Sequence, residues 1–190
     1  MAAWNRGKFM KLIFWVLILV SNHSVLGQNS DSDQPKIVPV DSVDLSQYAG
    51  VWYEIAKIPN RFQNQCARNT TAIYGLGEDG RIDVVNRCIT EDGGVDEARG
   101  IAKVVDPKSN ARLKVSFVRI LGLSLFWGDY WIIGLDSNYH YAIVGNPSRK
   151  YGWILCREPK MTAESLNEVF EILRNQGYDP QKFEMTEQKY

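Results

Sequence analysis

From Asp44 onward, hydrophobic and polar residues alternate with a period of two over short segments, and turn residues separate these segments. Such alternation predicts β-strands that have one buried face. The predicted strands are one that begins at Gly50, followed by 66–76, 81–89, 98–106, 111–118, 128–135, 139–144 and 151–157. Several of the connections are short and rich in Gly, Asp, Asn and Ser, so we expect consecutive strands to pair as antiparallel hairpins.

A meander of eight strands leaves two unpaired edges unless the sheet closes on itself. The pattern therefore predicts an all-β fold, an eight-stranded up-and-down antiparallel barrel. The interior of an eight-stranded barrel is just wide enough for packed side chains or for one small ligand.

Two helical segments accompany the predicted strands. Asp44 is suited to cap a single helical turn over 45–48, directly before the first strand. Near the C-terminus, Thr162 is a suitable N-cap and Gly177 lies where a left-handed C-terminal residue is expected. Between them, apolar residues recur at helical spacing, at Leu166, Val169, Phe170 and Leu173. A helix with one apolar stripe must cover the outside of the barrel. Residues 182–186 are suited to a final short strand.

The N-terminus has the composition of an export signal. Three basic residues precede an apolar run over 12–20, and a permissive cleavage site ends at Gly27. The run is shorter than the ~20 residues of a spanning helix, which favours a cleaved signal peptide over an uncleaved anchor. We therefore divide the chain into a signal peptide (1–27), a flexible polar leader (28–43) and one domain (44–190). No cysteine follows the cleavage site, so we expect a secreted or periplasmic protein without a lipid anchor; association with an outer membrane is left open.

Charge and cysteine content narrow the function further. The 22 basic and 22 acidic residues balance, and removal of the signal takes away three basic residues. The mature chain is thus slightly acidic, which argues against nucleic acid as a partner. Export places Cys66, Cys88 and Cys156 in an oxidising compartment, where an odd count leaves one thiol free or paired with another chain. Export into a eukaryotic secretory pathway would also make Asn69 a glycosylation acceptor; an unmodified strand segment is the alternative.

Catalytic and metal-binding patterns are lacking in the sequence. The two histidines are His23, inside the signal, and His140, with no nucleophile motif beside it. The cysteines lie far apart without paired histidines, so neither a metal site nor a cofactor is expected. We predict a protein that is not an enzyme.

Three motifs together resemble the lipocalins, and most closely the branch of bacterial lipocalins and apolipoprotein D. They are Gly50-Val51-Trp52, the acidic and aromatic segment 128–136, and Arg157 at the end of the last strand. The resemblance covers 44–190. It implies that Arg157 lies across Trp52 and closes the bottom of a cup-shaped barrel. A guanidinium on an indole face is attractive, and its donors suit the carbonyl groups of the 44–49 turn.

The implied direction of Arg157 sets the alternation of its strand. Leu155 and Trp153 would then face the barrel axis, and Ile154 and Cys156 would face outward, beneath the helix. On this reasoning Cys156 is the free thiol. Cys66 and Cys88 would form the disulfide if a bulge adjusts the register of the first hairpin. This pairing also occurs in bacterial relatives; a bridge between Cys66 and Cys156 is the alternative.

Alternation and the resemblance together assign eight residues to the lining of a ligand pocket: Tyr74, Val84, Leu113, Val115, Phe117, Tyr130, Ile132 and Trp153. The alternative is a barrel filled by its own side chains. The resemblance implies a carrier of a fatty acid, lysophospholipid or similar amphiphile, acting as a monomer or weak dimer. The apolar run 120–127 predicts either a flap that folds over the mouth, which we favour, or a membrane contact through Leu121–Trp127. An enzyme acting inside the barrel is the least favoured hypothesis.

Overall fold

A computed structural model describes residues 35–189, except 79 and 121–122. The predicted signal peptide and the first part of the predicted leader lie outside the described residues. No helix within the described ranges combines the length and the apolar character needed to cross a membrane.

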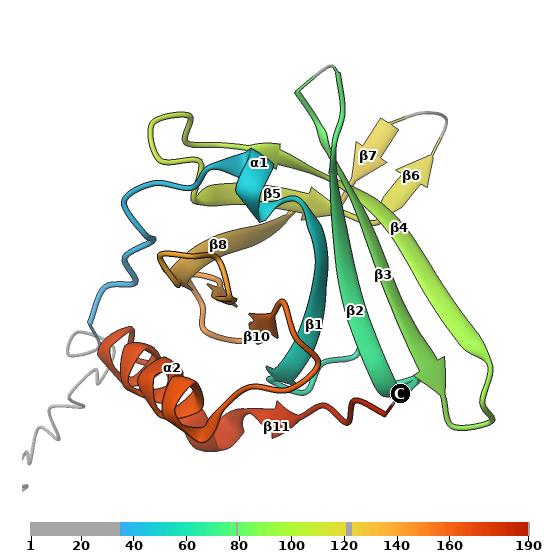
Figure 1. The fold of residues 1–190 in the computed structure, drawn as a ribbon. Helices are drawn as coiled ribbons and strands as arrows, with labels where there is room; N and C mark the ends of the chain where they lie inside the picture. The colour runs from blue at the N-terminus through green and yellow to red at the C-terminus, as the bar shows by residue number, and fades with distance from the viewer. Residues whose placement is uncertain (1–34, 79, 121–122, 190) are drawn as a thin grey trace, which may run out of the picture. The chain divides into compact units, whose positions relative to one another are not determined.

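Eight strands form the predicted closed antiparallel barrel (Figure 1). They are β1 (Gly50–Lys57), β2 (Cys66–Leu76), β3 (Ile82–Thr90), β4 (Val95–Val104), β5 (Arg112–Ser116), β8 (Gly128–Leu135), β9 (Tyr141–Gly145) and β10 (Gly152–Cys156). Each strand pairs with the next one in this order, and β10 pairs with β1 to close the sheet. Closure removes both free edges, which is the physical reason that the meander favours a barrel.

The apolar segment between β5 and β8 is the one that we expected to fold over the mouth. It contains a small separate hairpin of β6 (Val118–Ile120) and β7 (Leu123–Leu125). The side chains of Leu123 and Phe126 are 68% and 81% exposed. These two side chains are therefore not packed inside the barrel. Leu121 lies outside the described residues.

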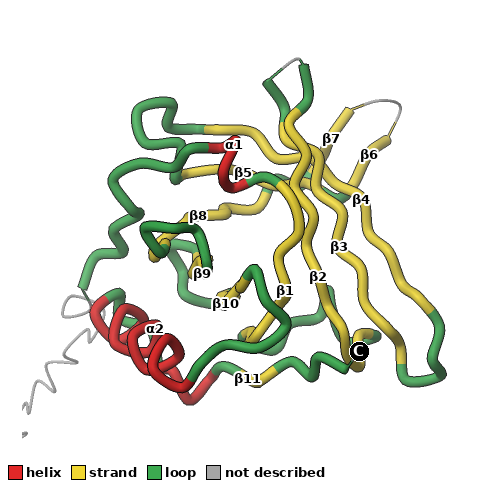
Figure 2. Tube along the Cα trace, in the orientation of Figure 1, coloured by secondary structure: helices red, strands yellow, loops and turns green. Residues whose placement is uncertain are grey.

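The α2 helix (Ala163–Asn175) lies outside the barrel, as predicted (Figure 2). Thr162 caps it by accepting a hydrogen bond from the Ser165 amide, and Gly177 has a φ of 74° just beyond its end. Val169 and Leu173 are buried in a cluster that also contains the outward-facing Ile154 and Cys156 of β10. This arrangement confirms the predicted alternation along that strand.

The part of the predicted leader that the structure describes is packed against the domain. Ile37 and Val43 are buried. The amide of Val40 donates to the carbonyl of Ile132 over 3.0 Å, and the amide of Val38 donates to Oε1 of Gln176 over 2.9 Å. Residues 35–43 therefore lie against the domain, because apolar residues within this polar segment occupy buried positions.

The disulfide joins Cys66 and Cys88, whose Cα atoms are 5.5 Å apart, as predicted. The pairing of β2 with β3 shifts register between Cys66 and Arg68. This irregularity is the register adjustment that the bridge required. Cys156 is a free, buried cysteine.

The C-terminal segment lies between the end of β1 and the start of β2. β11 (Glu184–Met185) pairs with the end of β1, and the Thr186 amide donates to the Ile55 carbonyl. Further along, the Asn69 amide of β2 donates to the Glu187 carbonyl over 2.8 Å. The segment therefore bonds to both β1 and β2, near the barrel end away from the start of β1. Both the amide nitrogen and the oxygen of the Asn69 side chain are bonded to the backbone of Lys189.

Candidate ligand-binding site

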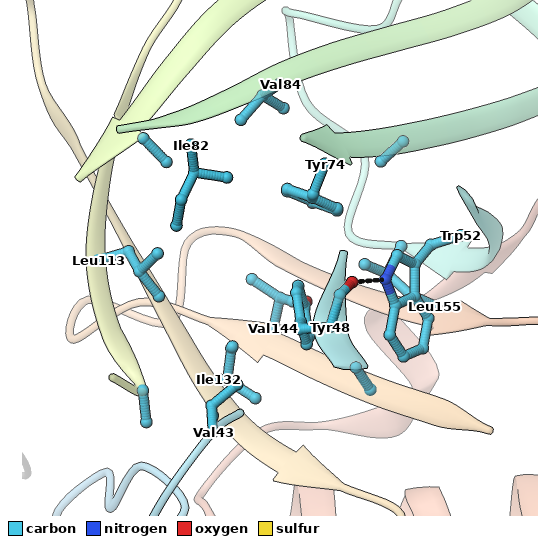
Figure 3. Close-up of a cluster of buried hydrophobic side chains, with 14 residues drawn as sticks. Val43, Tyr48, Trp52, Tyr74, Ile82, Val84, Leu113, Ile132, Val144 and Leu155 are labelled. Atoms are coloured by element: carbon cyan, nitrogen blue, oxygen red, sulfur yellow. Dashed lines mark hydrogen bonds between the residues drawn. The ribbon is translucent and has the colours of Figure 1, made fainter. Parts of the chain in front are cut away.

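The closed end of the barrel is built by α1 (Leu45–Tyr48) and Trp52. Asp44 caps α1 by accepting hydrogen bonds from the Ser46 side chain and amide and from Gln47, which lower the pKa of its carboxyl to about 2. The Trp52 side chain is 0% exposed, and its indole nitrogen donates to the carbonyl of Tyr48 over 2.7 Å. Figure 3 shows this bond and the convergence of side chains from the surrounding strands on the same interior space.

Arg157 occupies the position that the resemblance implied. Its guanidinium carbon lies 3.8 Å from the centroid of the Trp52 ring. It donates hydrogen bonds to the carbonyls of Gln47, Tyr48, Ala49 and Val51, over 2.5–3.2 Å. Arg157 therefore ties α1 and the first strand to the last strand of the barrel, which is a structural role.

The backbone conformation at position 50 favours glycine. The φ of Gly50 is 98°, a conformation that residues with a side chain rarely adopt. A Cβ atom at this position would lie 3.4 Å from a guanidinium nitrogen of Arg157. The glycine before Trp52 thus lets the chain turn from α1 into β1 beneath the arginine.

A pocket lies inside the barrel, against α1. Its cavity volume is about 10 Å³, room for about one water-sized group, so side chains occupy most of this space. Its lining is apolar except for tyrosine hydroxyl groups, and carries no charged side chain among the residues that the structure describes. The lining residues are Leu45, Tyr48, Ala49, Tyr74, Leu76, Ile82, Val84, Ala102, Leu113, Val115, Tyr130 and Ile132.

Three tyrosine hydroxyl groups meet in this pocket. The Tyr130 hydroxyl lies 2.8 Å from that of Tyr48 and 2.8 Å from that of Tyr74. Burial raises the pKa of Tyr74 to about 12 and raises the pKa values of Tyr48 and Tyr130 well above 10. Desolvation penalises the tyrosinate form, so the three groups stay neutral over the physiological range.

The structure places six of the eight predicted pocket residues in the lining of this pocket. They are Tyr74, Val84, Leu113, Val115, Tyr130 and Ile132. Phe117 lies beyond the end of β5 and is 40% exposed, and it is not among the lining residues. Trp153 packs against the interior cluster but pairs with Lys57, at the end of β1 farthest from α1. Alternation predicts the face of a strand correctly, but it does not predict depth along the barrel axis.

Sequence reasoning placed the 44–49 turn at the closed end of the barrel but did not assign its side chains to the pocket lining. Leu45, Tyr48 and Ala49 line the pocket because the helical turn lies across the barrel end. The available signal was Tyr48, an aromatic residue four positions before Trp52. Their ring centroids are 5.0 Å apart.

A polar network near the other end of β1 was also missed. The indole nitrogen of Trp153 donates to Oε1 of Gln63 over 2.9 Å, and Nε2 of Gln63 donates to Oε2 of Glu54 over 2.6 Å. Glu54 is buried and also accepts hydrogen bonds from Lys57 and Thr186. The network joins the interior face of β10 to the C-terminal segment.

A closed antiparallel barrel with one capped end and an apolar interior pocket defines the calyx class of binding proteins. The family model described as "Lipocalin-like domain" matches residues 43–188. The chain belongs to the lipocalin family, whose members bind small hydrophobic ligands inside the barrel.

Individual relatives agree with this assignment. Temperature-induced lipocalin-1 of Arabidopsis thaliana is 37% identical over 83% of this chain and 86% of its own length. Outer membrane lipoprotein Blc of Escherichia coli K12 is 32% identical over 94% of this chain and 98% of its own length. Apolipoprotein D of Mus musculus is 32% identical over 85% of this chain and 86% of its own length. The predicted branch of bacterial lipocalins and apolipoprotein D is therefore confirmed.

Solved structures support the fold. Insecticyanin from the tobacco hornworm Manduca sexta aligns with a TM-score of 0.65 and 23% identity, over 81% of this chain and 85% of that one. At this identity the likeness concerns the fold alone.

Proposed function

We propose that this protein carries or stores a small amphiphile, such as a fatty acid or lysophospholipid, outside the cytoplasm. The observation that carries the proposal is the uncharged interior pocket, in which six of the eight predicted residues meet above the floor made by Trp52 and Arg157. Such concave apolar sites with a few polar groups are typical of small-molecule binding. The mechanism is reversible burial, with no bond made or broken.

Transfer of the ligand's apolar part from water supplies the affinity. Each buried methylene contributes about 0.8 kcal/mol. Aliphatic residues such as Val84, Leu113 and Ile132 supply the surface that replaces water. We infer that the protein is not an enzyme, because its pocket lining has no carboxylate, imidazole or thiol to take part in chemistry, within the described part of the chain. The free thiol of Cys156 faces the helix α2 instead.

The proposed location is extracytoplasmic. The disulfide between Cys66 and Cys88 supports an oxidising compartment. The composition of 1–27 supports a cleaved signal peptide, and the absence of a cysteine near Gly27 argues against a lipid anchor. Detection of the processed chain in the periplasm or medium, with its N-terminal residue determined by mass spectrometry, tests this part.

Two measurements test ligand binding. Mass spectrometry of an organic extract of natively purified protein should detect one bound amphiphile at a fixed ratio to protein. Titration of delipidated protein with a long-chain fatty acid should change the tryptophan fluorescence in a saturable manner. An empty extract together with an unresponsive fluorescence signal would refute the proposal.

Membrane contact is a second candidate function, and one observation favours it. Leu123 and Phe126 expose large apolar side chains beside Leu125, on or directly after the β6–β7 hairpin. Exposed apolar groups of this kind are typical of membrane or protein contacts. A variant with Leu125→Asp and Phe126→Ser should lose sedimentation with phospholipid vesicles and keep its fatty-acid binding. A variant with Val95→Asp, on the separate β3–β4 hairpin, is the matched control and should sediment like the wild type. Equal sedimentation of the wild type, the double variant and the control would contradict this function.

A further inference from the structure

The tyrosine cluster at the inner end of the pocket has unused hydrogen-bonding capacity. Each tyrosine hydroxyl has one hydrogen to donate and lone pairs to accept with. The two contacts made by Tyr130, with Tyr48 and with Tyr74, use two of the three hydrogens. One donor and several lone pairs therefore remain for a group that reaches this end of the pocket.

The surroundings of the cluster favour a neutral group over an anion. No lysine, arginine or histidine is among the lining residues that the structure describes. Arg157 lies on the Trp52 ring at the closed end, and its guanidinium is bonded to backbone carbonyls. A carboxylate brought to the hydroxyl cluster would lose its hydration and would find Arg157 already bonded to four backbone carbonyls, which makes its burial costly. A hydroxyl or carbonyl group loses much less and is matched by the donor and acceptors present.

We propose that the cluster of Tyr48, Tyr74 and Tyr130 binds the polar end of a neutral amphiphile, one with a hydroxyl or carbonyl group, inserted toward α1. This proposal rests on ligand binding in the pocket and adds the ligand's class and orientation. A fatty acid would bind in the reverse direction, with its chain against α1 and its carboxylate toward solvent. Tyr130 is the specificity-determining residue, because its hydroxyl joins the other two.

The test compares two ligands of equal chain length, 1-dodecanol and dodecanoate at pH 8. Both are titrated calorimetrically into the protein as it is purified after native processing. Tyr130→Phe removes the central hydroxyl and keeps the ring. We expect it to weaken dodecanol binding about three- to tenfold, the equivalent of one net hydrogen bond, and to change dodecanoate binding less than twofold. Equal effects on both ligands, or on neither, would overturn the proposal.

Tyr139→Phe is the matched control variant. The Tyr139 hydroxyl accepts a hydrogen bond from the Asp44 amide over 2.8 Å, at the start of α1, but Tyr139 does not line the pocket. Its loss perturbs the same barrel end without touching the cluster, so it should leave the ratio of the two affinities unchanged. A ratio altered as much by Tyr139→Phe as by Tyr130→Phe would show that loosening of α1, and not the hydroxyl cluster, sets the preference.

A second measurement needs no variant. Nuclear Overhauser contacts of bound dodecanol should connect its C1 protons with the ring of Tyr130 or Tyr74. Contacts from C1 to Trp153 instead would place the hydroxyl at the opposite end and refute the orientation. Failure of the wild-type protein to bind either ligand would count against the carrier function itself, which separates that outcome from failure of the selectivity.

Discussion

Replacement of Arg157 by methionine keeps much of the side-chain length and removes the guanidinium. Four backbone carbonyls between Gln47 and Val51 would lose a charged donor, and the Trp52 ring would lose its cation at 3.8 Å. Hydrogen bonds to charged groups contribute about 1.5–3 kcal/mol each, and a cation on an indole contributes about 1 kcal/mol. Water can reach several of these carbonyls, because Arg157 is only partly buried. We therefore expect a total loss of about 3 kcal/mol.

Urea unfolding followed by far-ultraviolet circular dichroism measures this loss, because this signal reports mainly on the backbone. For a domain of this size, the same loss corresponds to a fall in melting temperature of roughly 6–12 °C. Arg99→Met is the control, because Arg99 forms a solvent-exposed ion pair with Glu97 whose loss should hardly change the free energy of unfolding.

A double-mutant cycle with Trp52→Phe measures the coupling between the two side chains, which includes the Tyr48 carbonyl to which both donate. We expect a coupling free energy of about 1 kcal/mol, because phenylalanine keeps a ring but offers a weaker face to the cation. Strict additivity of the two substitutions, or a loss below about 1 kcal/mol for Arg157→Met alone, would refute the view that Arg157 holds the closed end together.

Three further predictions concern other parts of the domain. Cys156 should react with a thiol reagent only after unfolding, because burial raises the pKa of its thiol and blocks access; rapid labelling of the folded protein would contradict this. Ionisation of Tyr74 should leave the free energy of unfolding unchanged below about pH 10 and should lower it as the pH rises from about 10 to 12, because the unfolded chain loses this proton first. Urea unfolding at a series of pH values measures the fall, and absorbance titration of tyrosinate follows the ionisation. Tyr74→Phe should lessen the fall. Thr186→Val should cost about 2 kcal/mol in urea unfolding by removing a 2.6 Å hydrogen bond to the buried Glu54 carboxylate, whereas Thr186→Ser should cost much less; equal losses would point to packing instead.

Local patterns in the sequence were enough to predict the barrel. Period-two alternation from Gly50 to Arg157 predicts strands, and short turns between them predict antiparallel neighbours, because both signals depend only on nearby residues. The helical spacing of apolar residues before Gly177 also depends only on nearby residues, and it predicts the helix α2. The contact of Arg157 with Trp52 joins the first and last strands of the barrel, which are far apart in the sequence, and it was predicted from the resemblance to a known family, with residue chemistry in agreement.

Tertiary structure alone decided the chemistry of the pocket floor. Tyr48, Tyr74 and Tyr130 are far apart in the chain, and their hydroxyl groups meet because α1 lies across the barrel end while β2 and β8 face it. Alternation predicts that a side chain faces inward but carries no information on its height along the axis, which is why Trp153 and Phe117 lie outside the pocket lining. The position of the C-terminal segment between β1 and β2 depends on backbone groups that those strands leave unpaired. Every residue except proline carries the same backbone donor and acceptor, so the sequence carries no signal for this position.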